Sequence, residues 1–138
     1  MLVIKHTIQT SASLEAIWKL WSDVPNWNVW DHGVESSTID GPFVTGATGT
    51  LKPVGGPLLH TKLTDVQPMK SFVTESKLPL ARIVVSHFMK QIERELEVTH
   101  QIEMRGVLAF LFAYVIGRSM KKNLPQEMQN MAKKAEAQ

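Results

Sequence analysis

Residues 80–105, LARIVVSHFMKQIERELEVTHQIEMR, contain two successive runs in which apolar and polar side chains alternate. One side of the first run carries Ile83, Val85, His87 and Met89, and one side of the second carries Leu96, Val98, His100, Ile102 and Met104. A period of two is typical of strands with one buried face. The short polar link Gln91-Ile92-Glu93 predicts a hairpin between the two runs. We therefore expect His87 and His100 to face the same interior side of neighbouring strands, a diagonal step apart.

The N-terminal part of the chain predicts a further strand and two short helices. Residues 2–9 alternate in the same way and place His6 on the inward side. Ser13 is a good N-cap for a first helix that stops near Ser22. Asp23 can cap a second short helix with Pro25 close to its first turn. Two short helices are therefore expected directly after the first strand.

From Gly33 onward, turn signals recur about every ten residues, a spacing typical of short antiparallel strands. The candidate strands between these turns are residues 34–39, 48–52, 58–66 and 71–76. Together with the first strand and the hairpin they make seven strands. Residues 106–135 have helical apolar spacing and no competing turn signal except Pro125. A long terminal helix, bent at Pro125, is therefore expected.

Length and composition limit the possible functions. The 138 residues suit one domain, 1–138, that is large enough to bury a core without disulfides. The absence of cysteine excludes disulfides, thiolate nucleophiles and cysteine metal sites. A net charge of +2 without a basic stripe argues against a nucleic-acid partner. The first residues lack the long apolar core of a signal peptide, and a cytoplasmic protein is expected.

The stretch after the first strand resembles a known family. Residues 17–30, IWKLWSDVPNWNVW, are similar to the VWxLLSDVxxWPxW opening of the polyketide cyclase/dehydrase and lipid-transport family, within the START-like SRPBCC superfamily. Residues 51–53, 63–68, 71–76 and 98–100 resemble its later blocks. The resemblance implies an α+β helix-grip fold: a curved, seven-stranded antiparallel sheet wraps a long C-terminal helix, with two short helices after the first strand. Members of the superfamily include cyclases, hydrolases, lipid carriers, receptors and co-chaperones, so the fold alone does not define the activity.

The helix-grip fold implies a cavity, because a sheet that wraps a helix does not fill its concave side, and related proteins hold an apolar ligand there. The candidate ligand-binding residues are Trp27, Trp30, Phe72, Thr74, Val85, His87, His100, Phe110 and Tyr114. They combine apolar walls with few polar groups, as small-molecule sites do. Each also has a purely structural explanation, as a core side chain or as a buried histidine with a satisfied hydrogen bond.

Two functional classes remain open. The first is a binding or carrier protein for a small hydrophobic ligand, such as a lipid, a polyketide or an aromatic compound. The second is a cofactor-free polyketide cyclase or dehydratase in which the cavity histidines act as acid and base, since imidazole titrates near neutral pH. A zinc site of His6, His87 and His100 lacks the spacing of metal-binding motifs. No metal and no cofactor are expected.

Residues 107–116 are almost entirely apolar around the whole helix circumference, which is more than one buried face needs. They are too few to span a bilayer, which takes about twenty residues, and stable membrane insertion is not expected. Exposed apolar patches of this kind mark interaction sites. We expect loops of the same chain to cover the outer side in the first place, and a homodimer in the second; transient contact with a membrane is the third alternative.

Overall fold

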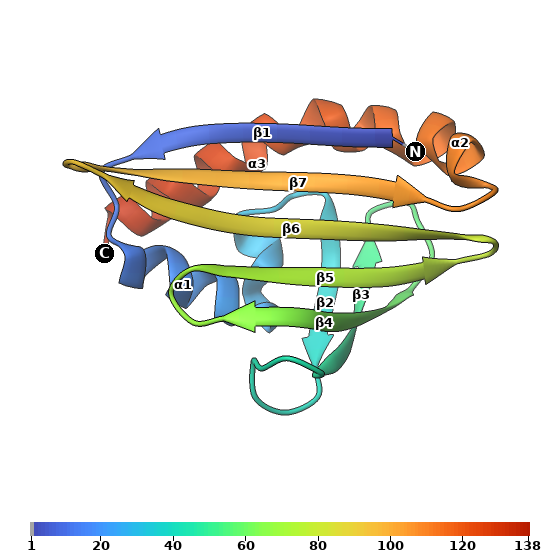
Figure 1. Cartoon of the computed structure of the whole chain (residues 1–138), viewed down its shortest axis with the longest axis horizontal. Coiled ribbons are helices and arrows are strands. Elements are labelled where there is room, and N and C mark those ends of the chain that lie inside the picture. The colour runs from blue at the N-terminus through green and yellow to red at the C-terminus, as the bar shows by residue number, and fades with distance from the viewer. Residues whose placement is uncertain (1) are drawn as a thin grey trace.

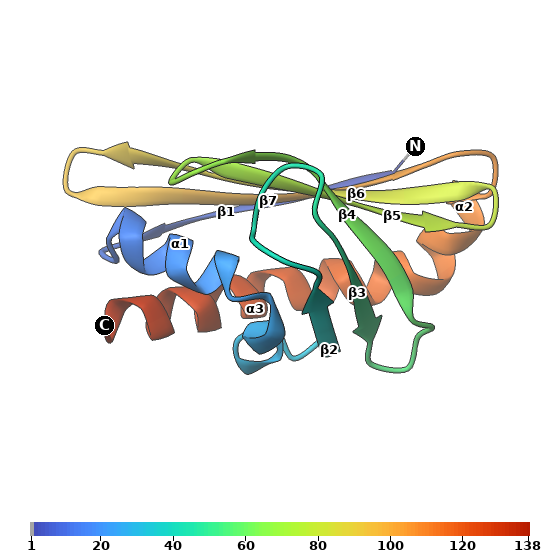
Figure 2. The ribbon, with the colours of Figure 1, turned by 90° about the horizontal axis from the view of Figure 1, so that it is seen from below.

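A curved antiparallel sheet forms one layer of the molecule, and α1 and α3 lie together on one of its faces (Figure 1, Figure 2). The computed structural model describes residues 2–138. The strand order across the sheet is β1-β7-β6-β5-β4-β3-β2. The strands are β1 (Leu2–Thr10), β2 (Val34–Ile39), β3 (Thr48–Pro53), β4 (Leu59–Gln67), β5 (Ser71–Leu78), β6 (Ala81–Ile92) and β7 (Glu95–Arg105). The helical segments are α1 (Leu14–Ser22), η1 (Val24–Val29), α2 (Ala109–Phe112), η2 (Ala113–Gly117) and α3 (Arg118–Glu136).

The predicted strands and the helix-grip fold are confirmed. Each of the seven strands is present, β2 has the predicted bounds, and all neighbouring strands pair antiparallel. The alternation arises because one face of the sheet packs on the helices: in β7, Leu96, Val98 and Met104 are buried on that face. Figure 2 shows β2 and β3 turned toward the helical layer, which gives the sheet its curvature.

The hairpin between β6 and β7 has a different register from the predicted one. A two-residue turn, Glu93-Arg94, joins the strands, and Glu93 has a positive φ of 56°. Tight hairpins require such left-handed residues, but glutamate gives little sign of this in a sequence. The turn predicted at residues 91–93 began too early. As a result His87 lies directly opposite His100, and the predicted diagonal step is wrong.

The short helices begin where the sequence predicts, with one difference in capping. The Ser13 hydroxyl accepts a hydrogen bond from the Ala16 amide at 3.1 Å and caps α1, as predicted. Asp23 occupies the cap position of η1, but its side chain makes no capping bond to the backbone. It accepts a hydrogen bond from the Asn26 side chain at 2.9 Å instead. Pro25 lies in the first turn, as expected.

The C-terminal helix begins later than predicted and contains an irregular segment near its start. It starts at Ala109, widens into the five-residue π-helical segment η2, and continues as α3 through Pro125. The structure therefore has an irregular segment at η2, which was not predicted, while Pro125 lies inside α3 and the bend expected there stays a prediction. There the helix passes close to β1, since a Cβ on Gly117 would lie 3.0 Å from the Leu2 side chain. π-helical segments are rare and are frequent at functional sites.

The core lies between the sheet and the helices. Its fully buried side chains come from both layers and include Ile17, Trp21, Phe72, Leu96, Val98, Met104, Leu124, Met128 and Met131. The helical layer therefore fills much of the concave side of the sheet. No helix among residues 2–138 is long and apolar enough to cross a membrane.

Candidate functional site

A row of aromatic side chains crosses the concave face of the sheet at one level. Phe72 of β5, His87 of β6, His100 of β7 and His6 of β1 are direct cross-strand partners. We call these four residues the histidine row. The Phe72 and His87 rings are stacked, with centroids 3.9 Å apart and planes inclined by 5°. His100 meets His87 edge to face at 4.5 Å. Among residues 2–138, no three His, Asp or Glu side chains are arranged to hold a metal ion.

Three tryptophans of the helical layer border the histidine row, and one of them, Trp27 of η1, lies 6.0 Å from Phe72. Trp21 of α1 lies 5.9 Å from His87 and 6.0 Å from His100, measured between ring centroids. Trp30, which follows η1, lies 6.3 Å from His100. Its carbonyl accepts a hydrogen bond from the Asn130 side chain of α3, which fixes its position. The three inner rings of the row are at most 8% exposed, so the aromatic cluster is closed.

The two inner histidines are neutral near pH 7. Burial lowers the pKa of His87 well below its ordinary 6.5, and the neighbouring His100 lowers it further. Burial lowers the pKa of His100 to about 4, against the opposing effect of Asp31. His87 Nδ1, His100 Nε2 and Trp21 Nε1 have no hydrogen-bond partner among residues 2–138. An unpaired buried polar atom costs about 1–3 kcal/mol, so packing alone does not explain these side chains.

Two carboxyl groups border His100 from the helical side. Glu127 Oε1 lies 3.6 Å from His100 Nδ1. Burial raises the pKa of Glu127 to about 7, and burial together with the charge of Glu127 raises the pKa of Asp31 to about 8. Asp31 also accepts a hydrogen bond from the Gly33 amide at 3.0 Å. Near neutral pH this carboxyl pair holds a proton beside a neutral imidazole, and the Glu127–His100 contact is not an ion pair.

Asp31 and Glu127 are absent from the predicted site. A signal for Glu127 is present in the sequence, because it lies three residues after Leu124 and four before Met131, on the apolar stripe of α3. A carboxyl group on a buried stripe needs a partner or a shifted pKa. Asp31 has no such signal, since only the tertiary structure brings the segment after η1 close to α3.

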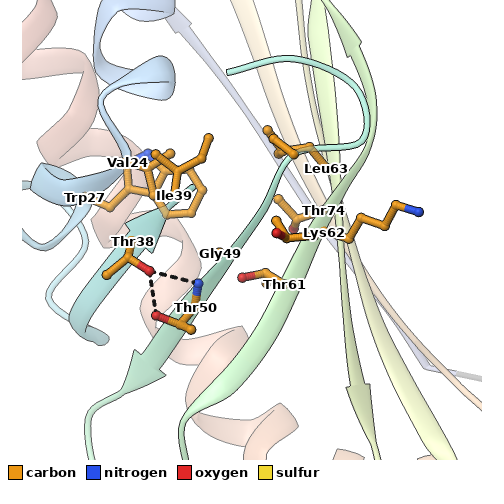
Figure 3. A pocket seen from close by; sticks show the side chains of 12 residues that line it. Val24, Trp27, Thr38, Ile39, Gly49, Thr50, Thr61, Lys62, Leu63 and Thr74 are labelled. Atoms are coloured by element: carbon orange, nitrogen blue, oxygen red, sulfur yellow. Dashed lines mark hydrogen bonds between the residues drawn. The ribbon is translucent and has the colours of Figure 1, made fainter. Parts of the chain in front are cut away.

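The space expected around the histidines is mostly filled by side chains. A cavity of about 20 Å³ lies between η1 and strands β2 to β5 (Figure 3). Trp27 and Thr74 line it, with Val24 near Trp27 and Leu63 near Thr74. It has room for about one water molecule. The expected cavity between the sheet and the C-terminal helix is therefore closed at the histidine row.

A larger space lies at the opposite edge of the sheet, between the edge strand β1 and the C-terminal helix. This groove has a volume of about 470 Å³, which is in the range of small-molecule sites. It is lined by Leu2, Val3, Ile4, Lys5, His6, Ala113, Gly117, Arg118, Lys121, Leu124 and Pro125. Apolar side chains from the strand and the helix meet two cations of α3, Arg118 and Lys121. His6 belongs both to the groove and to the histidine row.

The predicted ligand contacts divide into separate groups. Those in or beside the closed aromatic cluster and the small cavity are Trp27, Trp30, Phe72, Thr74, Val85, His87 and His100. Phe110 and Tyr114 lie apart, with 73% and 71% of their surface exposed, so their expected position on a cavity wall is wrong. The inner side of this helical segment carries the small residues Ala109, Ala113 and Gly117 at intervals of four. Phe110 and Tyr114, one position later, therefore point outward.

The apolar outer side of residues 107–115 is exposed, contrary to our first expectation that loops cover it. Val107, Phe110, Tyr114 and Val115 are between 66% and 76% exposed. An apolar surface of this kind on an isolated chain marks an interaction site.

Comparisons with known proteins agree with the fold. The sequence model of the polyketide cyclase / dehydrase and lipid transport family matches residues 1–136. No curated protein matches the chain. Among solved structures, a hypothetical protein of Helicobacter pylori is similar with a TM-score of 0.80 at 7% identity, over 97% of this chain and 88% of that one. A protein of Mesorhizobium loti gives 0.77 at 15% identity, over 99% and 98%. The Zhui aromatase/cyclase of a Streptomyces species gives 0.75 at 14% identity, over 98% and 93%. At these identities the structural likeness concerns the fold alone.

Proposed function

Because this chain belongs to the polyketide cyclase / dehydrase and lipid transport family, we propose that it binds a small hydrophobic molecule that carries a negatively charged group. The ligand occupies the groove between β1 and the C-terminal helix. The observation that carries this proposal is the groove itself. Its volume of about 470 Å³ suits a small ligand, and its walls combine apolar side chains with cations.

The apolar part of the ligand contacts the inner wall of the groove. Leu2 and Ile4 of β1 and Leu124 of α3 supply this wall. Ala113 and Gly117, with a small side chain or none, line the groove where the helix approaches the Leu2 side chain of β1. Apolar surface gains roughly 25 cal/mol for each Å² removed from water, so a hydrophobic ligand is stabilised by filling this space.

The charged part of the ligand lies at the rim. Arg118 and Lys121 are exposed, lie about one turn apart on α3, and both line the groove. The ion pairs within residues 2–138 include neither of them. Like charges at this spacing destabilise a helix by roughly 0.2–0.5 kcal/mol. An anionic group between them relieves this repulsion, which favours a carboxylate or a phosphate on the ligand.

Binding measurements with ligands that differ only in charge test this proposal. Native mass spectrometry of protein from its own source, followed by organic extraction, first shows whether a defined apolar molecule copurifies. A long-chain fatty acid, the matching fatty alcohol and an aromatic polyketide acid are then titrated by calorimetry. We expect the acids to bind more tightly than the alcohol, because only the acids pair with Arg118 and Lys121.

Lys121→Glu and Lys122→Glu form a matched pair for this test. Both lysines are exposed, and both substitutions change the net charge equally, but only Lys121 lines the groove. We expect Lys121→Glu to weaken acid binding roughly tenfold or more, since hydrogen bonds to charged groups contribute about 1.5–3 kcal/mol. Lys122→Glu should have a much smaller effect. Ala113→Phe, which places a ring in the groove, should abolish binding of the whole panel. Unchanged binding in Ala113→Phe, or equal losses in the two lysine variants, contradicts the proposal.

A second candidate function, a cofactor-free cyclase or dehydratase, is favoured by the buried acid and base groups. His100 is neutral, its Nε2 has no hydrogen-bond partner among the described residues 2–138, and the carboxyl pair of Asp31 and Glu127, which holds a proton, lies near its Nδ1. In a dehydration of this type the imidazole takes a proton from carbon, and a carboxylic acid protonates the leaving hydroxyl, which departs as water. His87, Phe72 and the other predicted contacts around the row would then touch the substrate.

The second function requires the aromatic cluster to open, and turnover separates it from binding alone. A β-hydroxyketone analogue of a polyketide is incubated with the protein, and the loss of one water is followed by mass spectrometry. Dehydration that disappears in His100→Gln but persists in Lys122→Gln would support catalysis at the histidine row. If the analogue binds but loses no water, only the ligand-binding function is supported.

The cellular location is part of the same proposal. A chain without cysteine needs no oxidising compartment for disulfide formation. We place the protein in the cytoplasm, and cell fractionation with an antibody against the folded chain tests this.

A further inference from the structure

One end of the molecule carries apolar side chains that remain exposed within residues 2–138. They come from the turn before β6 and from the segment after β7, are 46–76% exposed, and comprise Leu80, Val107, Phe110, Leu111, Tyr114 and Val115. We call these six residues the apolar end. Its two parts are joined, because the Leu108 amide donates a hydrogen bond to the Leu80 carbonyl at 3.1 Å. Figure 1 shows α2 beside the end of β7, at the end of the molecule opposite the C-terminus.

Leu80 is exposed and has an unfavourable backbone conformation. Its φ of 52° lies in the left-handed region, where a side chain crowds the following carbonyl. Glycine or asparagine is the usual residue at such a turn position. A leucine that is 70% exposed gains little from the core in return. The folded chain therefore gains little from an apolar side chain at this position.

The apolar end is bordered by cations. Residues 104–126 include four basic residues and no acidic one. Arg105 is paired with Glu103, whereas the ion pairs within residues 2–138 include none to Arg118, Lys121 or Lys122. The Arg118 guanidinium lies over the Tyr114 ring, 5.9 Å from its centroid. Exposed apolar side chains and unneutralised positive charge therefore lie next to each other on one helical segment.

We propose that the apolar end docks on the surface of an anionic lipid bilayer. Its apolar side chains enter the headgroup region while Arg118, Lys121 and Lys122 contact anionic headgroups, as in interfacial helices. Tyr114 suits the headgroup region of the bilayer, because its ring is apolar and its hydroxyl is polar. A second copy of this chain suits the surface less well, since a two-fold contact would bring the cations of both copies together. The contact is peripheral, because the segment is too short to cross the bilayer.

The docking surface adjoins the groove. Arg118 and Lys121 border both, and η2 contributes Tyr114 and Val115 to the apolar end and Ala113 and Gly117 to the groove. Docking therefore brings one rim of the groove toward the headgroups, where amphiphilic molecules are concentrated. The docking proposal goes beyond ligand binding and does not depend on it, since it rests on the exposure and charge of this end alone.

Co-sedimentation with vesicles tests the docking. Vesicles of phosphatidylcholine are compared with vesicles of equal parts phosphatidylcholine and phosphatidylglycerol. We expect binding to the anionic vesicles that weakens as salt rises. The double variant Phe110→Ser/Tyr114→Ser should lower the partition coefficient ~tenfold or more, because it removes the largest apolar groups of the surface. Lys121→Gln/Lys122→Gln should also lower it ~tenfold or more, since each lysine near an anionic surface contributes roughly fivefold.

Matched variants elsewhere on the surface serve as controls. Lys133→Gln/Lys134→Gln removes the same charge from the other end of α3, and Val54→Ser/Leu58→Ser removes apolar side chains that are 63% and 52% exposed outside the apolar end. Both controls should bind vesicles like the unmodified protein. Equal losses in test and control variants, or no binding to the anionic vesicles, overturns the proposal. A dimer in sedimentation velocity that dissociates in Phe110→Ser/Tyr114→Ser also overturns it, in favour of a second copy of the chain.

Lys122→Gln alone separates the docking from the ligand site. This residue borders the apolar end but does not line the groove. Weaker vesicle binding with unchanged fatty-acid affinity is the result expected for docking. If vesicle binding is lost in no lysine variant while fatty-acid binding is lost in Lys121→Glu, the docking fails and the groove proposal stands.

Discussion

The interior beneath the sheet and the apolar end each hold the kind of side chain that proteins normally place in the other location. His87 and His100 are buried and the Glu127 side chain is only 17% exposed, whereas Phe110 and Tyr114 are more than two-thirds exposed. In the interior, shifted pKa values keep the groups neutral or sharing a proton, so little charge is buried. At the apolar end, no part of residues 2–138 shields the surface from water. The difference teaches that the interior keeps its titratable groups from carrying full charge, whereas nothing within residues 2–138 removes the apolar end from water.

The largest expected difference concerns two phenylalanines. Phe72 is 1% exposed and stacks on His87, and its replacement by alanine should lower the free energy of unfolding by about 3–5 kcal/mol. Phe110 is 73% exposed, and Phe110→Ala should change the free energy of unfolding by no more than about 0.5 kcal/mol. Urea denaturation of both variants measures the contrast. Similar losses in the two variants would show that Phe110 is covered in solution.

The pH dependence of stability provides the next contrast. Asp31 and Glu127 have pKa values raised from 3.8 and 4.5 to about 8 and about 7, so the folded protein holds protons that the unfolded chain releases. Their stabilising contribution is complete below the pKa values that these groups have in the unfolded chain. It is lost as the pH rises through the folded pKa values of about 7 and about 8. His87 and His100 act in the opposite direction, because their lowered pKa values favour the folded state above pH 6.5 and disfavour it as the pH falls.

We therefore expect the free energy of unfolding to be greatest in mildly acidic solution and to fall above pH 6.5 by on the order of 1 kcal/mol per pH unit. Denaturant titrations at several pH values measure this decline. Asp31→Asn/Glu127→Gln should flatten it, whereas the exposed-charge variant Lys133→Gln/Lys134→Gln should retain it. Stability that rises between pH 6.5 and 8.5 in the unmodified protein would contradict the protonated carboxyl pair.

The smallest expected effect concerns two residues with left-handed backbone. Leu80 has a φ of 52° and Met69 a φ of 64°, and both are exposed. Replacement of either by glycine should raise the free energy of unfolding by about 0.5 kcal/mol, because relief of the backbone conformation exceeds the entropy of the more flexible unfolded chain. Only Leu80→Gly should also weaken binding to anionic vesicles. Equal vesicle binding of the two variants would show that Leu80 does not belong to the docking surface.

Much of the fold could be predicted from the sequence because it depends on local patterns. Strict alternation places one face of β7 against the core, and the Ser13 cap marks the start of α1. The register of the β6–β7 hairpin could not be predicted, since it depends on Glu93 adopting a left-handed conformation. Glutamate gives no sign of such a turn in the sequence. Because the turn lies slightly later than predicted, His87 and His100 are direct cross-strand partners and not diagonal neighbours.

The candidate site was predicted only in part. Alternation shows which face a side chain occupies, so the inward direction of His87 and His100 follows from the sequence. Whether the facing space is open depends on what the helical layer inserts, and here Trp21 and Trp30 close it. The groove lies where the small residues of η2 pass β1. It could not be predicted, because the position of the helix beside β1 depends on tertiary packing and not on a local sequence pattern.

The position of β1 has a practical consequence for protein production. Leu2 lines the groove beside Gly117, whereas the C-terminus lies at the far end of the molecule (Figure 2). An affinity tag joined ahead of Leu2 would start at the mouth of the groove, and its imidazoles could compete with an acidic ligand for the same space. A tag joined after Gln138 keeps both the groove and the apolar end free. Samples labelled at the C-terminus are therefore the appropriate material for binding assays.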